Sequence, residues 1–174
     1  MPQPGDALLT RIPGRVGLGI RVGERLLDGK CAYQHMAIVE DDVYAIEARP
    51  GGVSRRRLDS YDPAHTVFSS DYGLIPEHPE LIVARARWWL LKHAGYSYLD
   101  YLAIALHRWQ RSTPLDDWAE RRVISSQHVI CSQMGADCQA HDPSLAGLYD
   151  TEPYLVTPGD AYVAWLRWKV SHGG

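Results

Sequence analysis

Two apolar runs separated by a short acidic turn constrain the fold most. The first run is His35–Val39, the second is Val43–Ala48, and Glu40-Asp41-Asp42 lies between them. Short runs rich in β-branched side chains and bounded by turn residues are typical of paired strands. The segment therefore predicts a β-hairpin, which Pro50-Gly51-Gly52 ends.

Further elements are predicted on both sides of this hairpin. Ala7–Arg11 has the pattern of a short strand, and Val16–Leu27 that of a short amphipathic helix. The clearest helix is Pro79–Ala94, which opens on a proline at a tolerated first-turn position and stops before a glycine. A second helical stretch is expected at Tyr98–Arg111.

A third helix is expected to begin near Cys131. Its small or apolar residues are spaced to share one buried face of a helix: Cys131, Met134, Gly135 and Cys138. Strands in the first part of the chain and helices later predict an α+β fold, with a small antiparallel sheet packed against helices. Because no repeat or linker interrupts the 174 residues, one domain spanning 1–174 is expected.

Charge and hydropathy exclude several classes of function. The net charge of -3 gives no basic surface of the kind that binds nucleic acid. No apolar run is long enough for a transmembrane segment, and the opening residues lack the pattern of a signal peptide, so the chain is expected in the cytoplasm as synthesised. The aromatic C-terminal segment, with Tyr162, Trp165 and Trp168, is interpreted as packed core; if exposed, it would mark a surface for a protein partner.

The three cysteines indicate reduced thiols. An odd number with no Cys-x-x-Cys pair argues against a disulfide framework, and helical spacing would put Cys131 and Cys138 about 10 Å apart along the axis. Cys31 and His35 are four residues apart, but no second ligand pair accompanies them. We therefore expect neither a metal nor a cofactor.

A cysteine nucleophile requires a device that favours its thiolate, and a helix N-terminus or a neighbouring imidazole provides one. The predicted helix supplies the first device to Cys131, and His35 in the hairpin can supply the second. If the three acidic residues form the loop, Val39 pairs Val43, and His35 lies directly opposite Glu47 on one face. That face otherwise carries small or medium apolar groups suited to packing beneath a helix: Ala37, Val39, Val43 and Ala45.

Each of these residues also has an ordinary structural interpretation. A cysteine in a helix stripe is more often core, a strand histidine or glutamate is more often surface, and a two-residue loop would separate His35 from Glu47. His128 is a rival base, yet its closeness to Cys131 in sequence favours a structural or rim role. Arg55-Arg56-Arg57 has the composition of a solvated run that could steer a substrate bearing carboxylates or phosphates.

The order of several short motifs resembles the circularly permuted branch of the NlpC-type, papain-like superfamily, which includes YiiX-like proteins and the lecithin:retinol acyltransferase relatives. The matching segments are Gly5-Asp6-Ala-Leu-Leu, Tyr33-Gln34-His35-Met-Ala-Ile-Val39, Tyr44-Ala-Ile-Glu47-Ala48 with Gly52-Val53, Gly95-Tyr-Ser-Tyr98, Val129-Ile130-Cys131-Ser132 and Pro158-Gly159-Asp160. In this branch the histidine strand precedes the cysteine helix, as it does here.

The resemblance implies a papain-like domain and a role for each matching residue. Cys131 would attack a carbonyl, His35 would transfer the proton, and Glu47 would orient His35. Tyr98 would lie at the pocket edge, with Tyr96 an equal candidate. The expected oxyanion donor is the backbone N–H of Cys131.

The expected activity is a cysteine peptidase or amidase that cleaves amide bonds in peptidoglycan stem peptides. A second hypothesis is an acyltransferase or thioesterase acting on an acyl lipid. A third is an assembly module of a phage tail or secretion apparatus whose site is vestigial. Because peptidoglycan lies outside the membrane, the first hypothesis needs delivery by lysis, a virion or a secretion system.

Overall fold

The computed structural model describes residues 2–12, 32–96 and 128–172 of the chain. The helices predicted at Val16–Leu27 and Tyr98–Arg111 lie outside the described residues.

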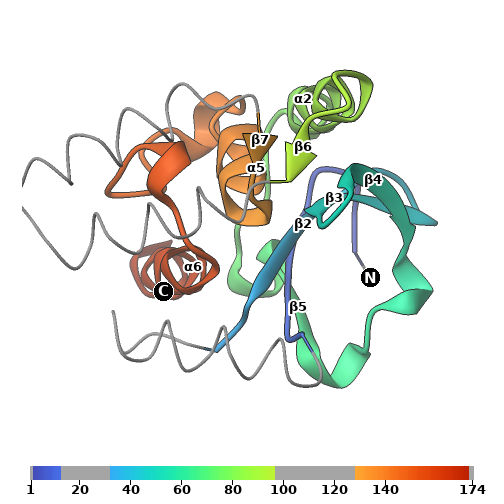
Figure 1. The fold of residues 1–174 in the computed structure, drawn as a ribbon. Helices are drawn as coiled ribbons and strands as arrows, with labels where there is room; N and C mark the ends of the chain where they lie inside the picture. The colour runs from blue at the N-terminus through green and yellow to red at the C-terminus, as the bar shows by residue number, and fades with distance from the viewer. Residues whose placement is uncertain (1, 13–31, 97–127, 173–174) are drawn as a thin grey trace, which may run out of the picture.

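A five-stranded antiparallel sheet forms the first part of the described structure (Figure 1). Its strands lie in the order β4-β3-β2-β1-β5. Their bounds are β1 (Ala7–Thr10), β2 (His35–Val39), β3 (Tyr44–Arg49), β4 (Gly52–Arg57) and β5 (Thr66–Phe68). The predicted first strand and the hairpin are therefore confirmed.

The third strand of the meander was missed by the sequence analysis. The run Arg55-Arg56-Arg57 belongs to β4, which pairs with β3 along its whole length, and its side chains are exposed or partly exposed, as a solvated run requires. Gly52 opens this strand at a φ of 108°, where an added Cβ would stand 3.0 Å from the carbonyl oxygen of Ala94. The three arginines can lie in a strand because Glu40, Ser60 and Asp59 accept hydrogen bonds from Arg55, Arg56 and Arg57 respectively.

Three helices follow in the described part of the chain: α2 (Pro79–Leu91), α5 (Cys131–Gln139) and α6 (Pro158–His172). The helices predicted at Pro79–Ala94 and from Cys131 are confirmed, the first with an earlier end. Strand β6 (Gly95–Tyr96) follows α2, and strand β7 (His128–Val129) precedes α5. The two strands form a short parallel pair. Short 3-10 turns complete the path: η1 (Leu58–Ser60), η2 (Pro63–His65), η3 (Ser69–Tyr72), η4 (Pro143–Leu145) and η5 (Pro153–Leu155).

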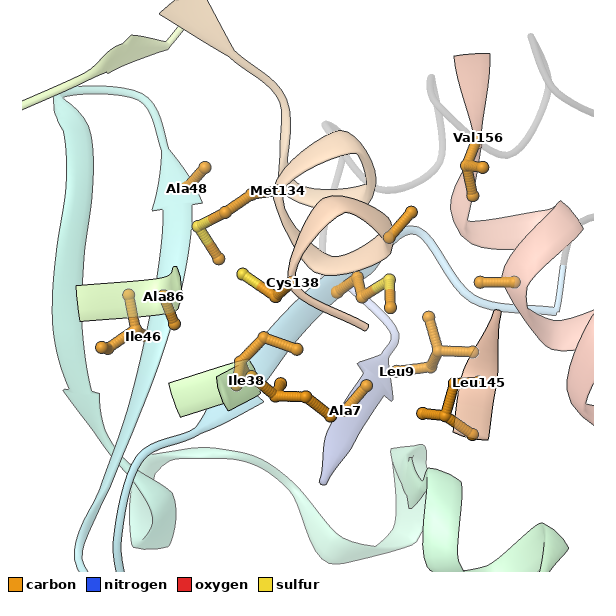
Figure 2. Packing of buried hydrophobic residues seen from close by; sticks show 14 of the residues in the cluster. Ala7, Leu9, Ile38, Ile46, Ala48, Ala86, Met134, Cys138, Leu145 and Val156 are labelled. Carbon is orange, nitrogen blue, oxygen red and sulfur yellow. The ribbon is translucent and has the colours of Figure 1, made fainter. Parts of the chain in front are cut away.

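The helices pack on one face of the sheet and form the larger core cluster. Met134 and Cys138 of α5 point toward Ile38, Ile46 and Ala48 of the strands (Figure 2). Helices α2 and α6 add Ile82, Ala86 and Trp165 to the same cluster. The alternation of side chains along the strands therefore directs Met36 and Ile38 of β2, and Ile46 and Ala48 of β3, toward the helices.

The opposite face of the sheet carries a second, smaller cluster that the sequence analysis misplaced. The predicted helix does not cover Ala37, Val39 and Ala45. These residues pack instead with Leu8, Tyr61, Leu58 and Phe68, while Val43 is exposed. Side chains from β1, β5 and the segment of η1 that follows β4 thus replace the helix on this face.

The aromatic segment in α6 is core, as expected. Trp165 is fully buried, and Tyr162 and Trp168 are partly buried against the larger cluster. Among the described residues, no helix is both long and apolar enough to span a membrane.

Gly135 allows the close approach of α5 to the sheet. A Cβ at this position would meet Sδ, Cε and Cγ of Met36 at 2.6, 2.7 and 2.8 Å. Met36 is fully buried between strand and helix, so its side chain has little room to give way.

We expect Gly135→Ala to lower the free energy of unfolding by about 1–3 kcal/mol, because overpacking outweighs the better helix propensity of alanine. Urea denaturation measures this change. The same substitution in a Met36→Ala background should cost markedly less, because the deleted side chain leaves space for the new methyl group. Equal costs in both backgrounds would contradict the packing explanation.

Candidate active site

His35 and Glu47 form a hydrogen-bonded ion pair across the first hairpin. The Nε2–H group of His35 donates to Oε2 of Glu47 over 2.7 Å. The histidine side chain is 12% exposed and the glutamate side chain 1%. The prediction that both residues project from the same face of adjacent antiparallel strands is confirmed.

Their predicted register was wrong by two residues. Glu47 pairs with Ala37, and Val39 pairs with Ala45, so His35 meets Glu47 diagonally. The difference arises at Glu40, which was assigned to the turn. A shift of two residues keeps the same face because side chains alternate with a period of two.

Glu40 lies in the protein interior, where arginines neutralise it. Its carboxylate is 1% exposed and accepts hydrogen bonds from Arg55 and from Arg87 of α2. The turn forms instead at Asp41, whose side chain accepts from the backbone N–H groups of Val43 and Tyr44. These contacts explain the longer connection between the strands.

Glu47 is held as a carboxylate by its neighbours. The Tyr61 hydroxyl donates to Oε2 over 2.7 Å, while Nη1 atoms of Arg49 and Arg56 lie 3.0 and 3.8 Å from Oε1. Burial alone would raise the pKa of Glu47, but the hydrogen bond and charge of His35, followed by Tyr61 and Arg49, lower it below the usual value. Glu47 is therefore an ionised acceptor within the fold.

Cys131 is the first residue of α5 and is 5% exposed. The preceding residue, Ile130, has extended backbone, and its N–H donates to the side chain of Gln133 over 2.9 Å. Gln133 also donates to the carbonyl oxygen of Tyr154, and Ser132 donates to that of Val156. These bonds fix the start of the helix, where backbone N–H groups and the helix dipole favour a negative charge.

The imidazole of His35 interacts with the Cys131 thiol as well as with Glu47. Burial of the ring opposes its protonation, but the charge interaction and hydrogen bond with Cys131, followed by those with Glu47, raise the pKa of His35 to about 10. Because Glu47 occupies Nε2, Nδ1 is the ring nitrogen left for Cys131. The three residues thus lie in sequence from a helix N-terminus to a buried carboxylate, with His35 between Cys131 and Glu47.

Cys138 has a different environment although it lies on the same helix stripe. Its thiol is fully buried, and burial followed by the nearby charge of Asp137 raises its pKa well above the usual value. Both Cys131 and Cys138 are free cysteines. The two thiols therefore lie in different environments, with Cys138 in the core.

The other residues considered from the sequence fall into two groups. Tyr96 lies in β6 and pairs with Val129, two residues before Cys131, so its backbone is close to the segment that leads into α5. His128 lies in β7 beside Gly95. Tyr98 and Cys31 lie outside the described residues.

Sequence reasoning missed the residues that surround Glu47. Recognising β4 as a strand would have placed Arg56 on its face, because Glu47 pairs with Ser54 and Ala45 with Arg56. For Tyr61 the signal was weaker: it is a lone aromatic residue between Ser60 and Asp62 in a polar turn segment. Only the path of the chain after β4 brings its hydroxyl to Glu47.

Within residues 2–12, 32–96 and 128–172, no group of three or more His, Cys, Asp or Glu side chains could hold a metal ion. No protein-family model, curated protein or solved structure matches this chain.

The lowered pKa of Glu47 predicts a pH-dependent contribution to stability. A carboxyl group whose pKa is lower in the folded state stabilises the fold above its ordinary pKa and loses that contribution as the pH falls. Glu47→Gln should therefore lower the free energy of unfolding more at pH 7 than at pH 4. Urea denaturation at both pH values tests this difference.

Glu77 is exposed and provides the control. Glu77→Gln should change stability by less than about 0.5 kcal/mol at either pH, as is usual for surface substitutions. A Glu47→Gln cost that is the same at both pH values would contradict the assignment of Glu47 as a buried carboxylate.

Proposed function

We propose that this protein is a cysteine hydrolase that cleaves amide bonds through an acyl-enzyme thioester on Cys131. The observation that supports this most is the position of His35, whose ring is hydrogen-bonded to a buried carboxylate and interacts with a thiol at a helix N-terminus. Nucleophile, base and orienting group in contact are the usual arrangement for covalent catalysis by a thiol.

The geometry supports a specific assignment of each step. The Cys131 thiolate attacks the carbonyl carbon, and the backbone N–H of Cys131 donates to the developing oxyanion. Protonated His35 gives its Nδ1 proton to the leaving amine. The bond between that amine and the carbonyl carbon breaks, and the acyl group stays on Cys131 as a thioester. Neutral His35 then takes a proton from water, which attacks the thioester and releases the acid and the thiolate.

Glu47 acts by fixing the ring rather than by moving the proton. Its carboxylate accepts from Nε2–H, which selects the tautomer with Nδ1 toward Cys131 and stabilises the imidazolium. Since His35, Glu47 and Cys131 come from β2, β3 and α5, the larger core cluster holds these elements together.

The proposed substrate class is the amide bond of peptidoglycan stem peptides. This part of the proposal rests on the resemblance of the motif order to permuted NlpC-type proteins. The papain-like assignment of the mixed fold has the same basis, together with the His35–Glu47 contact.

Thiol alkylation tests the proposed nucleophile without a substrate. At pH 6 iodoacetamide should modify Cys131 much faster than Cys138, because His35 stabilises the reactive thiolate while Cys138 is buried with a raised pKa. His35→Ala should move the reactivity of Cys131 toward higher pH. Peptide mapping by mass spectrometry measures both rates; equal rates, or a profile unaffected by His35→Ala, would reject the nucleophile.

Substrate assays test the reaction itself. Purified protein should release peptide fragments from muropeptides, and Cys131→Ala and His35→Ala should each reduce the rate by at least about a hundredfold. Glu47→Gln should cause a smaller loss, since it keeps an acceptor oxygen. Mass spectrometry of parallel incubations with phospholipid distinguishes the two substrate classes. Deacylated lipid together with intact muropeptide would contradict amide cleavage and favour a reaction on acyl lipids.

A further inference from the structure

One oxygen atom of Glu47 accepts two hydrogen bonds. Oε2 receives Nε2–H of His35 and the hydroxyl of Tyr61, each over 2.7 Å. Tyr61 follows η1 and is 8% exposed, with its ring in the smaller core cluster. It therefore approaches the carboxylate from a different segment than any of the three residues assigned to the reaction.

The second carboxylate oxygen of Glu47, Oε1, lies near charged groups but accepts no aligned hydrogen bond from the described residues. Oε1 is buried, and Arg49 and Arg56 lie near it. Apart from His35, Tyr61 is the one described side chain that donates an aligned hydrogen bond to Glu47. A carboxylate held only by charge could rotate and still satisfy the arginines, because ion pairs are less directional than hydrogen bonds.

We propose that Tyr61 is a positioning residue whose hydroxyl fixes Oε2 of Glu47 against Nε2–H of His35 and so keeps Nδ1 of the ring directed at Cys131. This inference rests on the proposed function for its catalytic meaning. The contact with Glu47 itself does not depend on that function.

The inference predicts a change in pH dependence. The groups that face Glu47 are His35 from β2, Arg49 from β3, Arg56 from β4 and Tyr61. Removing the phenol hydroxyl raises the pKa of Glu47 toward its usual value, so the carboxylate takes up a proton at a higher pH. Protonated Glu47 no longer stabilises the imidazolium that supports a reactive thiolate.

Tyr61→Phe removes the hydroxyl and keeps the ring that packs in the cluster and lies 5.1 Å from the Arg56 guanidinium. The rate of iodoacetamide alkylation of Cys131 is measured from pH 4.5 to 9. In the variant, the rate at pH 4.5 relative to that at pH 8 should fall by up to about twofold, because a glutamate carboxyl with its usual pKa is close to half protonated at that pH. An unchanged ratio would mean that Tyr61 only fills space.

Two controls separate positioning from stability. Leu58→Ala reduces packing in the same cluster and should leave the pH profile unchanged, even if the protein is less stable. In a Glu47→Gln background, Tyr61→Phe should have no further effect on the profile, because Tyr61 acts through the carboxylate. An effect of the same size in that background would overturn the proposal.

Nuclear magnetic resonance of the unsubstituted, ¹⁵N-labelled protein tests the contact without any activity. The Nε2 proton of His35 and the hydroxyl proton of Tyr61 should show a mutual Overhauser effect, because both are bound to one oxygen. Its absence would overturn the role of Tyr61. If the Overhauser effect is present but Cys131 is not reactive at pH 6, the hydrolase proposal fails and the Tyr61–Glu47 contact stands.

Discussion

The candidate site depends on one buried negative charge. An isolated carboxylate in a protein interior is strongly unfavourable, so Glu47 must be compensated by partners from several segments. It receives hydrogen bonds from β2 and from the segment after η1, and it has guanidinium groups near it from β3 and β4. Because His35 and Tyr61 both bind this carboxylate, the His35 ring and the segment that carries Tyr61 are held in fixed positions relative to each other.

A second buried carboxylate links the hairpin to the helical layer. Glu40 is paired with Arg55 of β4 and Arg87 of α2, while Arg85 of α2 pairs with Asp137 of α5. The larger core cluster supplies non-directional attraction between the layers, whereas these pairs fix direction and register. The site therefore lies in a framework whose elements are held by both kinds of interaction.

The elements with strong local signals could be predicted from the sequence. The positions of residues that depend on contacts distant in the sequence could not. The hairpin, the helix at Pro79 and the helix at Cys131 follow from periodicity and from Pro and Gly signals that act within one element. The placement of Glu40 depends on Arg87, 47 residues later in the chain, so an acidic triplet in sequence gave no sign that its first member is buried. The His35–Glu47 contact was nevertheless predicted, because an error of two residues in register preserves the face. Tyr61 could not be predicted because its role arises only from the return of the chain after β4.

The bonds at the start of α5 also set the order in which the site can assemble during synthesis. His35, Glu47 and Tyr61 belong to the first part of the chain, but Ser132 and Gln133 bind carbonyl oxygens of Val156 and Tyr154. Since a chain leaves the ribosome from its N-terminus, the sheet with its imidazole and carboxylate emerges well before the segment that anchors the thiol. The Cys131 thiol therefore reaches its final position only after residues 154 to 156 have emerged, when His35 and Glu47 are already available to receive it.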